Sequence, residues 1–158
     1  MKFNDFVCAD SIKVDLSASD KEGVICELVD CLIGGGHIES PERDNIVQAI
    51  MKREELGSTG IGRRSAVPHT KHPSVQRPMG TVGISRSGVE FQSLDGESVQ
   101  LFFLLISPPD RPGDHLRALE YISKQLDKDT FRRFLSQCQT ASEVQQLLEE
   151  ADNNLLPA

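Results

Sequence analysis

The spacing of apolar residues predicts helices at both ends of the chain. Side chains three or four residues apart share one face of a helix, and apolar residues recur at that spacing in five segments. Two capping boxes, Ser19 with Glu22 and Thr140 with Glu143, mark the first and last of these helices. The five helices are expected from the box at 19–22 to the glycines at 34–36, from Ser40 to Leu56, within 108–126, from near Asp127, and after the box at 140–143. In the third helix we expect the leucines 116, 119 and 126 and Ile122 to face inward.

Between these helices, alternating and continuously apolar runs predict strands. The segment 12–16 alternates apolar and polar residues, 65–69 is short and β-leaning, and 80–85 places Val82 and Ile84 on one face. After a turn at 94–97, the run "SVQLFFLLIS" is typical of a central strand that is buried on both faces. The pattern indicates an α/β or α+β fold in which helices cover a sheet.

Composition narrows the class of partner. The chain has 158 residues, enough for one domain with a core, and a net charge of −7, which argues against binding of a nucleic-acid backbone. Its longest apolar run, 101–106, is too short to cross a bilayer, and the first ten residues lack the apolar core of a signal peptide, so we expect a cytoplasmic protein without membrane insertion. The four cysteines form no C-x-x-C pair and are expected to be buried, reduced thiols.

The stretch "GSTGIGRRSAVPHTKH", 57–72, combines the residue types that a small anion needs. Basic residues concentrate within 52–86, either as an anion site or as an ordinary solvated loop. Backbone amides in a glycine-rich loop can bind an anion, and arginine adds bidentate hydrogen bonds. A neutral histidine beside them, here His69, can act as the nucleophile that accepts a phosphoryl group. From these residues alone, a structural role for His69 remains open.

Two further histidines bear on this choice. His72 makes an H-x-x-H pair with His69, but no cysteine or carboxylate cluster completes a zinc site. We therefore expect His72 and His37 to be surface residues.

The run "KREELGSTGIGRRSAVPHTKH", 52–72, resembles the active-site segment of type-2 EIIA proteins, the fructose/mannitol family of the phosphoenolpyruvate-dependent sugar phosphotransferase system. The resemblance continues through "LDGESVQLFFLLISPPDRPGDHLRALEYISKQL" and covers about 10–150. The nitrogen-regulatory IIA subgroup is the most similar, because "REELGSTGIG" leads into "AVPH". The resemblance implies a single α/β domain over 1–158, with a mixed β-sheet of about five strands sandwiched between helices.

The resemblance also implies the roles of individual residues. His69 matches the histidine that accepts phosphate from phosphorylated HPr or an HPr-like carrier. Arg53 matches the arginine that pairs with the phosphoryl oxygens, and His115 matches a second histidine that approaches the first; these three are the expected catalytic residues. Candidate phosphate-binding residues are Ser58, Thr59, Gly60 and Gly62. No metal or cofactor is expected.

We expect a phosphoryl carrier that acts by phosphorylation-dependent binding of a regulatory target. One alternative is the IIA component of a fructose/mannitol-type uptake system, which passes phosphate to a separate IIB. The chain departs from the family pattern at Arg63-Arg64-Ser65, where positive φ at a residue other than glycine is costly. That departure keeps open a second alternative, a binding module that has lost phosphotransfer.

Overall fold

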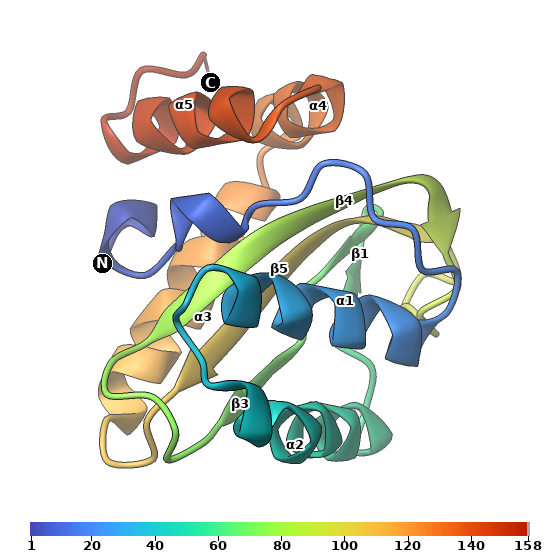
Figure 1. Ribbon diagram of the computed structural model, residues 1–158. Helices are drawn as coiled ribbons and strands as arrows, with labels where there is room; N and C mark the ends of the chain where they lie inside the picture. Colours follow the sequence, from blue (N-terminus) through green and yellow to red (C-terminus); the bar gives the residue numbers. More distant parts are fainter. Residues whose placement is uncertain (158) are drawn as a thin grey trace.

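A mixed sheet lies between two layers of helices in the computed structural model, which describes residues 1–157 (Figure 1). The strands are β1 (Gly60–Gly62), β2 (Ser65–Ala66), β3 (His69–Lys71), β4 (Met79–Val89) and β5 (Val99–Ser107). The helices are α1 (Lys21–Gly34), α2 (Arg43–Glu55), α3 (Pro112–Leu126), α4 (Asp129–Gln137) and α5 (Ala141–Asp152). The predicted α/β fold with a five-stranded mixed sheet is confirmed.

Strand β5 is buried on both faces, as its apolar sequence predicts. Successive side chains of a strand point to opposite faces, so the strand contributes to two separate cores. Phe102, Leu104 and Ile106 pack in the core under α1 and α2. Leu101, Phe103 and Leu105 pack in the core under α3, α4 and α5. The N-terminal segment lies on this second side, next to α5 (Figure 1).

The order of strands explains how the candidate site is placed. Strand β4 runs antiparallel to one edge of β5, and β2 and β3 follow one another along the opposite edge, both parallel to β5. The link between them is Val67–Pro68, and proline has no backbone N–H to continue the ladder. Pairing resumes at once, because Leu105 donates to the Pro68 carbonyl at 3.1 Å and His69 is the register partner of Leu105.

Two local predictions were wrong. The segment 12–16 is not a strand: it bends at residues 14 and 15, and only Lys13 forms an isolated bridge, with Gly83 of β4. Asp20, not Ser19, caps α1, because its Oδ1 accepts from the Gly23 amide at 2.7 Å. The predicted Thr140 cap of α5 is present, with its side chain accepting from the Glu143 amide at 3.1 Å.

The N-terminal half of helix α3 presents a different face to the core than predicted. Leu116, expected to face inward, is 56% exposed, and Leu119 is half-buried, whereas Ile122 and Leu126 are buried as predicted. The neighbour of Leu116, His115, takes the inward position and is 7% exposed. Successive residues of a helix lie about 100° apart, so turning His115 toward the sheet turns Leu116 to solvent.

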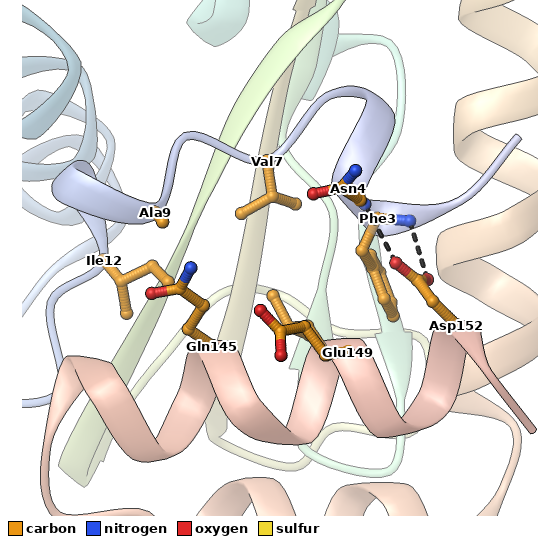
Figure 2. A pocket seen from close by; sticks show the side chains of 9 residues that line it. Phe3, Asn4, Val7, Ala9, Ile12, Gln145, Glu149 and Asp152 are labelled. Atoms are coloured by element: carbon orange, nitrogen blue, oxygen red, sulfur yellow. Dashed lines mark hydrogen bonds between the residues drawn. The ribbon is translucent and has the colours of Figure 1, made fainter. Parts of the chain in front are cut away.

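The N-terminal segment is held against α5 by a buried carboxylate (Figure 2). Asp152 accepts hydrogen bonds from the Phe3 amide at 2.9 Å, from the Asn4 amide at 3.0 Å and from the Tyr121 hydroxyl at 2.5 Å. We call this arrangement the Asp152 latch. The shallow pocket in Figure 2 lies between this segment and α5, and its lining includes none of the predicted site residues.

Over residues 1–157, no helix combines the length and the apolar character that crossing a bilayer requires. All four cysteines are free, as expected, but only Cys8 and Cys138 are buried; Cys26 and Cys31 are half-buried.

Candidate functional site

His69 is the first residue of β3 and is held in one orientation by the turn before it. The residues 66–68 are buried, and the proline just before His69 restricts the backbone. The His69 Nδ1 lies 2.7 Å from the Val67 carbonyl oxygen. A carbonyl can only accept, so Nδ1 carries the proton and donates it. In the neutral ring the unprotonated nitrogen is therefore Nε2, with its lone pair free for chemistry.

His115 approaches His69 from the first turn of α3. The two ring centroids lie 5.5 Å apart and the ring planes are tilted by 53°. The His115 Nδ1 lies 2.6 Å from the Ser107 Oγ, at the end of β5. The structure thus brings together two histidines that are 46 positions apart in the sequence, because β3 and the start of α3 both lie at the same end of β5.

Arg53 reaches this region from the last turn of α2, which packs beside β3. Its Nη1 donates to the Gly57 carbonyl oxygen at 2.8 Å, so the side chain folds over the C-terminal end of its own helix. Its positive charge is close enough to His69 to lower the pKa of that ring. We refer to Arg53, His69 and His115 together as the cluster.

Both imidazoles of this cluster favour the neutral form. Burial lowers the pKa of His69 below its ordinary value, and the charges of Arg53 and Lys71 lower it further, against the opposing effects of the Val67 carbonyl and the Glu54 carboxylate. Burial, together with His69 and Lys71, lowers the pKa of His115 to about 4. At neutral pH a lone pair is therefore available on His69, as nucleophilic attack requires.

Glu54 is a buried residue of the site that the sequence analysis missed. It is 6% exposed and forms an ion pair with Lys21 of α1 at 2.9 Å. Its Oε1 also accepts from the Thr59 amide at 3.2 Å, and its Oε2 accepts from the Thr59 hydroxyl. Glu54 thereby ties the loop after α2 to two helices. Its position at the end of an amphipathic helix was the available clue, but an exposed surface glutamate gives the same pattern.

Of the four predicted phosphate-binding residues, Ser58 and Thr59 have their hydroxyl groups hydrogen-bonded within the protein. The Ser58 hydroxyl donates to the Phe91 carbonyl at 2.7 Å and accepts from the Gly60 amide at 3.0 Å, and the Thr59 hydroxyl is bound to Glu54. Gly60 packs against Ser93, and Gly62 faces the Asp95 carboxylate. These contacts hold the loop in place, and a direct role in binding phosphate stays a prediction.

Arg63 and Arg64 form the tip of the β1–β2 hairpin. Their φ values are 56° and 61°, a left-handed conformation that costs about 1 kcal/mol at each residue other than glycine. The Arg63 side chain pairs with Asp127 after α3, and Arg64 Nη1 donates to the Gln100 side chain at 3.3 Å. The next residue, Ser65, pairs with Leu101 of β5, four positions from the partner of His69, which is about 13 Å along the strand. The two arginines thus lie outside the histidine cluster.

The remaining histidines have other partners. The His72 Nδ1 lies 2.7 Å from the Ser74 Oγ, and the His37 Nε2 lies 2.7 Å from the Asp10 carboxylate; both residues are half-buried. Within residues 1–157, His, Cys, Asp and Glu side chains form no group of three or more that could hold a metal ion.

Comparison with known proteins places this arrangement in a family. The family described as "Phosphoenolpyruvate-dependent sugar phosphotransferase system, EIIA 2" matches residues 5–151. The chain belongs to this family. Type-2 EIIA proteins are components of a phosphotransferase system, and the resemblance read from 52–72 and 94–126 is confirmed.

Relatives of this type-2 EIIA protein carry two kinds of name. The fructose-specific EIIABC component of Bacillus subtilis is 32% identical over 96% of this chain, which spans only 24% of that longer protein. A nitrogen regulatory protein of Pseudomonas aeruginosa is 35% identical over 73% of this chain and 76% of its own length. The crystal structure of the nitrogen regulatory protein IIA-Ntr from Neisseria meningitidis has a TM-score of 0.82 and 28% identity, covering 90% of this chain and 96% of that one.

Proposed function

We propose that this protein is a phosphoryl carrier whose acceptor atom is the Nε2 of His69. The observation that carries the proposal is the hydrogen bond from His69 Nδ1 to the Val67 carbonyl, which leaves Nε2 with a lone pair. In the transfer, Nε2 forms a bond to phosphorus as the bond between phosphorus and the imidazole nitrogen of the donor breaks. The donor's bonding electrons stay on its nitrogen, and no oxidant or reductant is needed.

Two further side chains support this reaction. The incoming phosphoryl group carries negative charge on its oxygens, and the guanidinium of Arg53 can donate charge-assisted hydrogen bonds to them. His115, neutral and next to His69, supplies a second polar contact without adding a charge of its own. The donor we propose is a phosphorylated HPr-like carrier, and membership of a phosphoenolpyruvate-dependent phosphotransferase family supports this choice.

The acceptor assignment is tested by incubation with an HPr-like carrier that has been charged with radiolabelled phosphate. We expect the wild type and the matched control His72→Ala to become labelled with an acid-labile phosphate, because the His72 ring is bound to Ser74. His69→Ala should remain unlabelled. Equal labelling of His69→Ala would overturn the assignment, and an unlabelled wild type would select a binding module without phosphotransfer.

For the fate of the phosphate, we propose regulation: a phosphoryl group adds about −1.5 to −2 charges and changes which partners the surface around His69 can bind. The similarity to nitrogen regulatory proteins supports this role. The match of 96% of the chain to a fructose-specific component supports the alternative, transfer to a IIB. Rapid passage of label from this protein to a purified IIB of the fructose or mannitol class would select the transport role over regulation.

A further inference from the structure

Ser107 occupies a buried position directly behind the second histidine of the cluster. It is the last residue of β5 and has no exposed surface, and its Oγ lies 2.6 Å from the Nδ1 of His115. The His115 ring is itself 7% exposed and is tilted against the ring of His69. Ser107 therefore occupies the Nδ1 of His115, which leaves only the Nε2 of that ring for a group bound on His69.

The direction of this hydrogen bond follows from the partners of the hydroxyl. Among the described residues, His115 is the one hydrogen-bond partner of the Ser107 Oγ. If the imidazole donated, the hydroxyl proton would be left in the interior without an acceptor, which is a costly arrangement. If the hydroxyl donates instead, both atoms are satisfied. Nδ1 of His115 then accepts, in contrast to Nδ1 of His69, which must donate to a carbonyl.

The lowered pKa of His115 agrees with this direction of the hydrogen bond. Its pKa of about 4 means that the ring is neutral at pH 7 and carries a single N–H. With Nδ1 accepting from Ser107, that proton must be on Nε2. A proton there gives a hydrogen-bond donor to a negatively charged phosphoryl oxygen, whereas the other tautomer would present a lone pair and repel it.

We propose that Ser107 is a positioning residue that keeps His115 in the Nε2–H tautomer, so that this N–H donates to the phosphoryl group carried by His69. The assignment of the tautomer stands on the hydrogen bonds alone. Its use during phosphotransfer rests on the proposed function.

The tautomer is tested first, without phosphate, by long-range ¹H–¹⁵N correlation spectra of protein labelled with ¹⁵N-histidine. We expect the Nε2–H pattern for His115 in the wild type. The matched control is Ser85→Ala, which removes another buried hydroxyl of the sheet, one bound to the Gly88 amide. Ser85→Ala should keep the pattern, and Ser107→Ala should lose it. An Nδ1–H pattern in the wild type overturns the proposal, whether or not the variants fold and whether or not His69 is phosphorylated.

The second test measures labelling of His69 by the phosphorylated carrier. Loss of the hydroxyl should slow labelling about fivefold to tenfold in Ser107→Ala, and Ser107→Thr, which restores it, should recover most of the rate. In a His115→Ala background, Ser107→Ala should cause no further loss. Equal slowing with and without His115 would show that Ser107 acts by another route and would overturn the coupling. Failure of the wild type to be labelled would instead refute the proposed function and leave the spectra to decide the tautomer.

Discussion

Glu54 and Asp152, the two buried carboxylate side chains among residues 1–157, have different roles in two regions of the molecule. Both are less than 8% exposed and both join segments that are far apart in the sequence. The Asp152 carboxylate accepts three hydrogen bonds, two of them from amides of the N-terminal segment. Glu54 instead holds the loop beside a cluster in which the Nε2 of His69 keeps a free lone pair. A folded protein is most stable when its buried polar groups are all hydrogen-bonded, whereas nucleophilic attack requires a nitrogen whose lone pair is free.

The first and largest test of this comparison is Glu54→Ala. It leaves Lys21 without its buried partner and frees the Thr59 amide and hydroxyl. We expect the free energy of unfolding in urea to fall by about 3 to 4 kcal/mol, and labelling of His69 by the carrier to slow in the population that remains folded. Glu54→Gln keeps the shape and is the matched control for the charge. Labelling of Glu54→Ala at the wild-type rate would show that phosphotransfer to His69 does not depend on Glu54.

Asp152→Ala is the counterpart in the latch. It removes the acceptor of the Phe3 and Asn4 amides and of the Tyr121 hydroxyl, so we expect a loss of about 2 to 3 kcal/mol in the free energy of unfolding. Hydrogen exchange should show the N-terminal segment opening first. The rate at which folded protein is labelled should not change, and a reduced rate would mean that the latch and the His69 cluster are coupled.

Arg53→Ala tests the electrostatic half of the site. Removal of the cation should slow labelling about 100-fold, or about 2.7 kcal/mol in the barrier, because the phosphoryl oxygens lose a charge-assisted donor. The unfolding free energy should change by less than about 1 kcal/mol, since the side chain is half-buried and makes one hydrogen bond to the Gly57 carbonyl. Arg64→Ala, on the hairpin tip, is the matched control and should be labelled at the wild-type rate.

Acid should destabilise the protein through His115 of the cluster. The pKa of His115 is lowered to about 4 in the folded protein. The unfolded chain therefore binds more protons below pH 6.5, and stability is lost as the pH falls from about 6.5 toward 4. Between pH 7.5 and 4.5 this group should contribute a loss of about 2.5 kcal/mol. Urea titrations of His115→Gln should show that much less acid sensitivity, and identical pH profiles would contradict the assigned pKa.

The smallest effect is expected at the hairpin. Arg64→Gly should raise the free energy of unfolding by about 1 kcal/mol, because glycine adopts the positive φ of this position without strain. Arg64→Ala, which keeps a Cβ, should not gain this stability. Wild-type labelling of Arg64→Gly would agree with the placement of the hairpin tip outside the cluster, and slowed labelling would require that the tip reach the donor.

The accuracy of the sequence predictions differed between types of feature. The family motif in the glycine-rich segment and the continuous apolar run of β5 are local features of the sequence, so the family and the buried central strand could be predicted. Leu116 was placed inward because an apolar residue at helical spacing normally faces a core. In the structure His115 faces inward in its place, while Ile122 and Leu126 are buried as expected. Segment 12–16 alternates like a strand, but its chain bends after one bridge to β4.

The sequence by itself determined the family and the sheet between helices, because these depend on motifs and on the pattern of apolar residues along the chain. Only the tertiary structure decided which polar atoms are paired. The Val67 carbonyl accepts the Nδ1 proton of His69. The Ser107 hydroxyl is hydrogen-bonded to His115, and the Glu54 carboxylate is hydrogen-bonded to Thr59. The contact between Ser107 and His115 depends on how the end of β5 packs against the first turn of α3. The spacing of residues along the chain does not specify this packing.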